Sequence, residues 1–317
     1  MNFPVLDQFH LALDRIKPFI KKTPIISSSS LNHMFNLDIY FKLELLQKTG
    51  SFKSRGAINK IIQLSEKEKK KGVIAISAGN HAQATSWACS QIGIKSKIVM
   101  PYGASKSKIK ATKSYGGEVI LTKEKMMDTC ERIIESEGLS FVHPFDDMDI
   151  ILGQGTTSLE VINKIKDLDY AFISIGGGGL ISGMAYVLRK YNPKIKIIGV
   201  EPINSNVMTN SIKSNKPEIF DTLKNKTIAD TLAAPFAGDI TFEFVKEFVD
   251  EIINVSEQEM IDSLRIMIER LKIIPEPAAS ACLAPILFNK IKINPNSKCL
   301  VVVCGGNIDL KKLKSLF

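Results

Sequence analysis

The sequence has few of the residues from which disulfide frameworks and zinc sites are built. Its 317 residues include only five cysteines and four histidines. No two cysteines form a C-x-x-C pair, and the histidines share no metal-ligand spacing with them. The composition therefore argues against a disulfide-stapled fold and against a structural zinc centre, and reduced thiols in a cytosolic setting fit better.

Long hydrophobic runs and a secretion signal are missing as well. The longest apolar runs, such as CLVVVCGG, are far too short to span a bilayer. Residues 1–22 mix charged and apolar side chains from the start, which a signal peptide does not do. We therefore expect a cytoplasmic protein that has no membrane partner.

Nucleic-acid motifs are also absent, although the formal net charge is +9. The basic residues are mostly lysines, scattered over stretches such as EKEKKK and KSKIKATK, and arginines are few. Such a surface attracts small anions, including carboxylates and phosphates, without selecting among them. We expect no nucleic-acid partner.

What the sequence does contain is an alternation of short apolar runs with longer amphipathic stretches. This order predicts an α/β fold with parallel sheets and helices on both faces. We predict strands within residues 37–44, 72–77, 95–101, 117–122, 170–177, 194–202 and 298–306. We predict helices within residues 54–71, 81–93, 106–116 and 124–138, and one helical segment over 240–272.

Three glycine-containing turns directly follow predicted strands: SAGNHAQA at 77–84, GGGGLISG at 176–183 and CGGNIDL at 304–310. In doubly wound sheets, ligands bind at the carboxyl ends of the strands, so the three turns predict one shared pocket. Four consecutive glycines, Gly176, Gly177, Gly178 and Gly179, leave backbone amides free to surround a phosphate at the start of a helix.

The glycine turn does not match the common nucleotide motifs. A P-loop requires a lysine after the glycines, and none follows. The dinucleotide fingerprint requires a last glycine where this chain has Ile181 or Ser182, although Glu201 lies about 20 residues further on, where a ribose-binding acid is expected. A nicotinamide oxidoreductase therefore remains an alternative with the wrong glycine spacing.

The stretch TGSFKSRGA carries the strongest signal. Together with SAGNHAQA, HPFDD, GQGT, GGGGL, VEP, TIAD, PEPAAS and CGGN, it resembles the fold-type II pyridoxal-phosphate enzymes over nearly the whole chain. The resemblance is to their serine/threonine dehydratase and serine racemase branch. It implies two doubly wound open-sheet domains of the tryptophan synthase β-like kind. The large domain would comprise residues 1–69 and 148–317, and the small domain residues 70–147.

The same resemblance assigns roles to individual residues. Lys53 would form the Schiff base with pyridoxal 5'-phosphate, with Phe52 beside the cofactor ring. The remaining cofactor-binding residues would be Asn80 at the ring hydroxyl, Cys304 at the ring nitrogen, and Gly176, Gly177, Gly178, Gly179 and Leu180 at the phosphate. The substrate-binding residues would be Ser77, Ala78, Asn80 and His81.

The chemistry needs these residue types. A partly desolvated lysine loses some of its proton affinity, so Lys53 can act as a nucleophile and then as the base that removes a proton from Cα. A thiol at Cys304 is too weak an acid to keep the ring nitrogen protonated, which favours prompt loss of a β-hydroxyl. A cysteine that merely fills space on a buried strand is an equal alternative.

Two positions separate a dehydratase from a racemase. Racemases of this branch place a second serine where this chain has Ala78, and a methyl group cannot move a proton. Racemases also carry the sequence His-Pro-Asn where this chain has His143-Pro144-Phe145, the sequence found in threonine dehydratases. We therefore expect a dehydratase that acts on L-threonine and also on L-serine. Its partner would be a small-molecule amino-acid substrate. A serine racemase, a dehydratase of another 3-hydroxy amino acid and a catalytically silent homologue remain as alternatives.

The resemblance also bears on ions and assembly. Glu201 resembles the acidic ligand of a divalent cation, but Val207 stands where the partner acid is expected, and one carboxylate holds a hard cation poorly. Glu276 resembles an acid near the cofactor edge, or it is an acid at a helix N-terminus. We expect a homodimer or homotetramer, and no carboxy-terminal regulatory domain.

Overall fold

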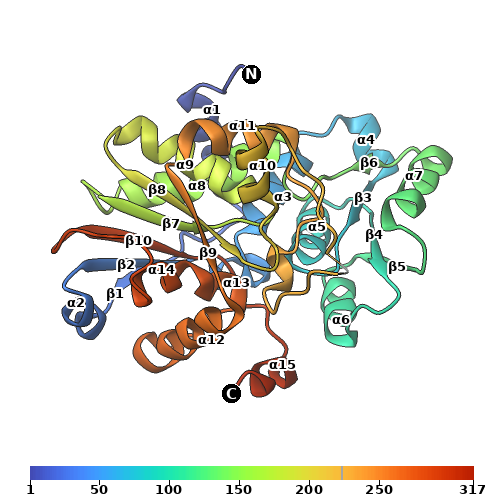
Figure 1. Ribbon diagram of the computed structural model, residues 1–317. Coiled ribbons are helices and arrows are strands. Elements are labelled where there is room, and N and C mark those ends of the chain that lie inside the picture. The colour runs from blue at the N-terminus through green and yellow to red at the C-terminus, as the bar shows by residue number, and fades with distance from the viewer. Residues whose placement is uncertain (223) are drawn as a thin grey trace.

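The computed structural model describes residues 1–222 and 224–317 and contains two sheets (Figure 1). The larger sheet has six strands in the order β1-β2-β10-β7-β8-β9. Its strands are parallel except at the edge, where β1 pairs with β2 in the antiparallel sense. They are β1 (Ile25–Ser27), β2 (Asp38–Leu43), β7 (Tyr170–Ser174), β8 (Lys196–Pro202), β9 (Glu251–Val255) and β10 (Lys298–Val303).

The smaller sheet has four parallel strands in the order β5-β4-β3-β6. These are β3 (Val73–Ile76), β4 (Ser96–Pro101), β5 (Glu118–Thr122) and β6 (Ser140–Phe141). The two parallel-stranded sheets confirm the predicted α/β fold class. All four strands lie inside the range 70–147 that we predict for the small domain, and the domain boundaries themselves stay a prediction.

Helices cover both faces of the larger sheet (Figure 1). Figure 1 shows α8, α9 and α11 on one face and α12, α13 and α14 on the other, while α6 and α7 flank the smaller sheet. The α-helices are α1 (Leu6–Ile16), α2 (Ser29–Phe35), α3 (Lys53–Ile62), α4 (Glu66–Lys71), α5 (Asn80–Gln91), α6 (Lys106–Ser114), α7 (Met126–Glu137), α8 (Met148–Ile162), α9 (Gly179–Tyr191), α10 (Val207–Ser214), α11 (Asp239–Phe248), α12 (Glu257–Ile266), α13 (Pro277–Ser280), α14 (Ala284–Leu287) and α15 (Leu310–Ser315). Short 3-10 turns are η1 (Glu44–Leu46), η2 (Lys48–Gly50), η3 (Asp230–Leu232) and η5 (Ala281–Leu283), and η4 (Met267–Leu271) is a π-helical turn.

The predicted continuous helix over 240–272 is wrong. The chain there forms α11, then the edge strand β9, then α12 and η4. The β-branched residues Ile252, Ile253 and Val255 favour the strand, which pairs with β8. Ser256 then restarts a helix with a capping box, in which its hydroxyl and the Glu259 side chain each bind the other's backbone N–H. Periodicity alone did not reveal this capping signal.

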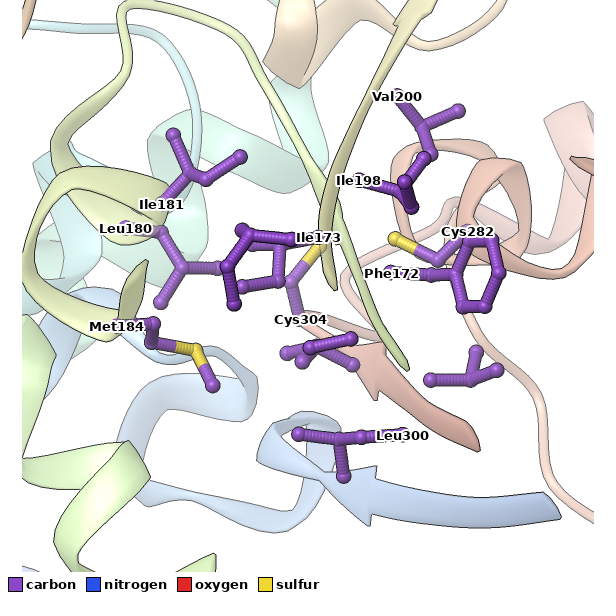
Figure 2. Close-up of a cluster of buried hydrophobic side chains, with 14 of the residues drawn as sticks. Phe172, Ile173, Leu180, Ile181, Met184, Ile198, Val200, Cys282, Leu300 and Cys304 are labelled. Carbon is purple, nitrogen blue, oxygen red and sulfur yellow. The ribbon is translucent and has the colours of Figure 1, made fainter. Parts of the chain in front are cut away.

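The core of the larger sheet is made by its own apolar strands and the helices on its faces. Figure 2 shows side chains from β7, β8, β10 and α9 packed together, among them Phe172, Ile198, Leu300 and Met184. Burial of this contiguous cluster stabilises the sheet, and because β7 and β10 are parallel neighbours, their carboxyl ends lie side by side at one edge. No helix in the described part of the chain is long and apolar enough to cross a membrane.

Candidate functional site

Lys53 is the first residue of α3, directly after a turn joined to the end of β10. The backbone N–H of Phe52 donates to the carbonyl oxygen of Cys304 at 3.0 Å. The Lys53 amine donates to the carbonyl oxygen of Pro144 at 2.6 Å and lies 5.2 Å from the centre of the Phe52 ring. Burial lowers the pKa of Lys53 to about 8, and the nearby carboxyl of Glu276 opposes that shift. The amine therefore loses its proton at a much lower pH than an ordinary lysine does.

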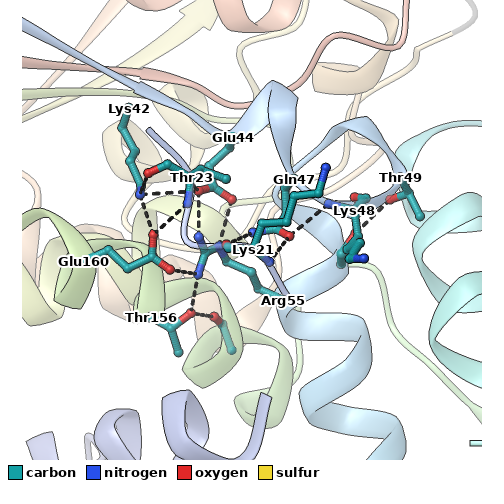
Figure 3. A network of polar contacts seen from close by, with 12 residues as sticks. Lys21, Thr23, Lys42, Glu44, Gln47, Lys48, Thr49, Arg55, Thr156 and Glu160 are labelled. Carbon is teal, nitrogen blue, oxygen red and sulfur yellow. Dashed lines mark hydrogen bonds and ion pairs between the residues drawn. The ribbon is translucent and has the colours of Figure 1, made fainter. Parts of the chain in front are cut away.

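A buried network of charges anchors the helix that carries Lys53 (Figure 3). Arg55, two residues further along α3, is fully buried and makes two 2.8 Å hydrogen bonds to Glu44 and one to Glu160. Lys42 donates to Glu160 at 2.5 Å and to the carbonyl oxygen of Thr23 at 2.9 Å. Burial alone would raise the pKa of Glu44, but Arg55 and Lys42 hold it below its usual range. The two cations and two anions therefore balance, and α3 is held at its first turn.

The four glycines lie between β7 and α9, and they leave no room for side chains. Gly178 has φ +94°, a conformation that favours glycine. A Cβ atom on Gly177 would lie 2.2 Å from the Phe145 ring. In the described part of the chain, the amides of Gly176, Gly177 and Gly178 donate to no protein acceptor. Three free amides beside the first turn of α9 form a cradle for an anion.

The turn at 143–146 packs against this cradle. Nδ1 of His143 accepts the backbone N–H groups of Phe145 at 3.2 Å and Asp146 at 2.7 Å. The Asp146 carboxylate accepts three backbone N–H groups at the start of α11, and the Thr241 hydroxyl donates to the Gly177 carbonyl at 2.7 Å. The ring of Phe145 also contacts that of Phe236. The sequence reading missed Thr241 and Phe236, which carry no motif of their own.

Cys304 follows β10, where it is buried, and the Ser174 hydroxyl donates to its sulfur at 3.5 Å. Burial raises the pKa of Cys304 well above its usual value, and Glu276 and Cys282 add to the shift. Figure 2 places Cys304 and Cys282 on the two sides of β7. The thiol of Cys304 therefore keeps its proton at neutral pH and carries no charge.

The turn at 77–81 begins α5 and faces Glu276. The Ser77 hydroxyl accepts the N–H of Gly79 at 3.0 Å, and Ser77 and Ala78 are partly buried. The Asn80 amide donates to Oε1 of Glu276 at 2.8 Å. Glu276 makes no capping hydrogen bond to α13, so its carboxyl serves this turn instead of its own helix. Burial raises the pKa of Glu276 to about 7.

His81 is turned towards the protein interior. A ring nitrogen, Nε2, lies 2.9 Å from the carbonyl oxygen of Val142, so it carries a proton and donates to that oxygen. Burial lowers the pKa of His81 to about 3, and the charge of Lys53 adds to the shift. The neutral ring ties α5 to the end of β6, and a role of His81 in substrate binding stays a prediction.

Glu201 is buried at the end of β8, where it caps α10. Its oxygens accept the backbone N–H of Met208 at 3.0 Å, the N–H of Thr209 at 2.7 Å and the Thr209 hydroxyl at 2.6 Å. These three hydrogen bonds at the start of a helix stabilise the buried carboxyl of Glu201 without the need for a bound cation. Among the described residues, no group of three or more histidine, cysteine or acidic side chains could hold a metal ion. The structure adds no support to a metal site at Glu201.

Comparisons with known proteins agree on one family. The family model described as pyridoxal-phosphate dependent enzyme matches residues 16–305. The chain is 39% identical to a serine racemase of Schizosaccharomyces pombe (strain 972 / ATCC 24843) over 315 residues, which cover 98% of this chain and 96% of that protein. It is 40% identical to the catabolic L-threonine dehydratase TdcB of Escherichia coli (strain K12) over 320 residues, which cover 99% of this chain and 97% of that protein.

A solved structure shows the same arrangement. The serine racemase of Dictyostelium discoideum superposes with a TM-score of 0.90 at 37% sequence identity, covering 96% of this chain and 99% of that one. The similar proteins thus include racemases and a dehydratase at nearly equal identity, and overall similarity does not choose between the two activities.

Proposed function

Because the chain belongs to the pyridoxal-phosphate dependent enzymes, we propose that it is an ammonia-lyase that converts L-threonine, and L-serine, to a 2-oxo acid and ammonia. The substrate class is a small amino acid, in keeping with the names of its relatives. The observation that carries the proposal is Ala78, a residue without a transferable proton in the turn that begins α5.

The residues around Lys53 fit pyridoxal phosphate, the cofactor of the family. The free amides of Gly176, Gly177 and Gly178 suit its phosphate, and a Cβ atom on Gly177 or Gly178 would collide with Phe145 or Thr241 and displace the turn. Within the described residues, Oγ of Ser51 and Oε2 of Glu276 are buried and have no hydrogen-bond partner, which is typical of a site that awaits a polar ligand.

Four parts of the chain would hold the cofactor. We propose that Lys53 attaches its aldehyde, that the glycine turn and Leu180 bind its phosphate, and that Phe52 packs beside its ring. Asn80 would bind the ring hydroxyl and Cys304 would face the ring nitrogen. When bound, the cofactor supplies an aldehyde that links to the substrate amine and a conjugated ring that withdraws electrons from Cα.

The chain's own groups then perform the proton transfers. Once the substrate amine replaces it at the aldehyde, the released amine of Lys53 would take the proton from Cα of the amino acid. The β-hydroxyl would take up a proton and leave as water, and hydrolysis of the resulting unsaturated amine would consume one water, so the net products are the 2-oxo acid and ammonia. Cys304 keeps its proton, cannot protonate the ring nitrogen, and so favours departure of the β-group over a long-lived carbanion.

Serine racemisation is the second candidate, because two of the compared proteins are serine racemases. Inverting Cα requires an acid on the face opposite Lys53 that can return a proton. By the resemblance, Ala78 occupies the position of that acid, and its methyl group cannot donate. We therefore rank racemisation below elimination.

One set of assays tests the proposal. The purified protein, supplied with pyridoxal phosphate, is incubated with L-threonine, L-serine or D-serine, and 2-oxo acid and serine enantiomers are measured. We expect 2-oxo acid from L-threonine and L-serine, loss of activity in Lys53→Ala, and full activity in Lys67→Ala, which removes an exposed lysine. D-serine formation without 2-oxo acid would instead identify a racemase.

Assembly and location remain predictions. Family resemblance supports a homodimer or homotetramer in the cytoplasm, and a protein with reduced cysteines agrees with that compartment. Light scattering on the purified protein would give the number of subunits, and a monomeric mass would contradict this expectation.

A further inference from the structure

Three side chains that are distant in sequence meet at the start of α5. Asn80 donates through Nδ2 to Oε1 of Glu276 at 2.8 Å and accepts through Oδ1 from Nδ2 of Asn307, also at 2.8 Å. Asn80 and Glu276 are buried, and Asn307 is half-buried in the turn that follows β10. Asn307 has no role in the proposed function above.

These two contacts determine which way the Asn80 amide faces. Oε1 of Glu276 is an acceptor, and it also accepts from the Thr231 hydroxyl. It therefore requires the NH₂ side of the Asn80 amide to face it. The Asn307 NH₂ group selects the oxygen side. The NH₂ group of Asn80 carries two hydrogens and Glu276 takes one, so the second stays available to a ligand. If Asn307 were removed, nothing on its side of the amide would oppose the reversed orientation.

Asn307 also holds the turn that leads to Lys53. The second hydrogen of its NH₂ group goes to the carbonyl oxygen of Thr49 at 2.7 Å. Thr49 has φ +57°, which is rare for a β-branched residue, and the turn therefore needs an external support. Gly50 permits the approach, since a Cβ there would lie 2.5 Å from Oδ1 of Asn307.

We propose that Asn307 is a positioning residue that joins the turn before Lys53 to the Asn80 amide and keeps an N–H of that amide directed at the cofactor. It links three segments: the turn at 48–52, the turn at 304–310 after β10, and the start of α5 beside the smaller sheet. The ligand class it serves is the ring hydroxyl of pyridoxal phosphate, which accepts such an N–H. Asn307 itself need not touch the cofactor.

A double-mutant cycle on cofactor affinity tests this role. The cofactor is removed, and pyridoxal phosphate is titrated back into wild type, Asn307→Ala, Asn80→Ala and the double variant while visible absorbance is followed. Loss of one buried hydrogen bond predicts about a tenfold weaker affinity for each single variant. Because Asn307 acts through Asn80, the double variant should bind within about twofold of the weaker single variant.

Other variants guard against a general structural defect. Asn294→Ala, at an exposed asparagine, should bind the cofactor as wild type does. Asn307→Asp keeps the shape but replaces both donors by acceptors facing two oxygens, so it should bind more weakly than Asn307→Ala. Should Asn307→Ala fail to fold, Asn307→Asp and Asn80→Ala form the cycle. Wild-type affinity in the Asn307 variants, or penalties that multiply in the double variant, would overturn the proposal.

Turnover gives a second readout, which rests on the proposed function. With saturating cofactor, Asn307→Ala should lower kcat for L-threonine about tenfold and leave KM within about twofold, because the Asn80 N–H that Asn307 directs is the one that binds the cofactor ring hydroxyl. An unchanged kcat, or a change in KM alone, would contradict this. The cofactor titration needs no turnover, so failure of the proposed function would leave the cycle intact and interpretable.

Discussion

The amine of Lys53 donates a hydrogen bond to the carbonyl oxygen of Pro144, 2.6 Å away. Lys53 begins α3, whereas Pro144 lies in the turn after β6 of the smaller sheet. The next residue in that turn, Phe145, packs its ring on Gly177 of the glycine cradle. One short turn therefore contacts both the reactive amine and the predicted phosphate site.

The first prediction concerns the pH dependence of cofactor uptake. Burial lowers the pKa of Lys53 from 10.5 to about 8, and only the neutral amine attacks an aldehyde. The rate at which the cofactor-free protein takes up pyridoxal phosphate should rise about tenfold per pH unit below pH 8 and level off above it. Stopped-flow absorbance would measure the rate. A rise that continues to pH 10 would show that the amine has its ordinary pKa.

The second prediction concerns the glycine cradle. Gly177→Ala places a methyl group 2.2 Å from the Phe145 ring, so the turn must shift, and cofactor affinity should fall more than tenfold. Gly103→Ala is the matched control, because a Cβ there meets nothing within 4 Å. Titration with pyridoxal phosphate would measure both.

A second-site change checks the cause of that loss. Adding Phe145→Ala to Gly177→Ala removes the clash and should restore part of the affinity. If the double variant binds more weakly than Gly177→Ala alone, the ring is not the obstacle and our account of the cradle is wrong.

The third prediction concerns Ala78. Ala78→Ser supplies a hydroxyl in the turn before Asn80, and we expect racemisation of L-serine to rise at least tenfold while 2-oxo acid formation persists. Chiral chromatography of the products would measure it. Lys53→Ala in the same background should abolish both reactions. No gain in D-serine would mean that this position does not face Cα.

The fourth prediction concerns the buried charges beneath α3. Arg55→Met leaves Glu44 without its main partner, and Glu160 with Lys42 alone, in a dry environment, so the free energy of unfolding should fall by about 3–5 kcal/mol. Urea unfolding of the two proteins would show the difference. Arg132→Met, which breaks an exposed pair with Glu124, should cost less than about 1 kcal/mol. Equal losses in the two variants would contradict the assignment of Arg55 as a buried anchor.

Much of the fold could be predicted from the sequence because its signals are local. Short apolar runs located β2, β3, β4, β5, β7, β8 and β10, and the glycine turn after β7 indicated an anion site. The prediction of one helix over residues 240–272 was wrong because it also relied on a local signal, the amphipathic period. That period concealed a short edge strand that pairs with β8, and the local signals of that strand, its β-branched residues and the capping box at Ser256, were outweighed by the periodicity.

The site's supporting contacts could not be predicted, because they join residues far apart in the chain. Asn80 and Asn307 are 227 positions apart, and Arg55 and Glu160 are 105 apart. The sequence does show an asparagine after CGG, but only the fold brings it to Thr49 and Asn80. Glu276 could be placed at a helix N-terminus from sequence, yet its carboxyl points to another helix.

The most direct test of the account is to locate the covalent attachment of the cofactor. Borohydride reduction of the cofactor-loaded protein fixes a pyridoxyl group on the lysine that binds it, and trypsin does not cleave after a modified lysine. We predict a labelled peptide spanning residues 49–55, TGSFKSR, with the tag on Lys53. A tag on any other lysine, or no tag in protein that contains the cofactor, would contradict the account.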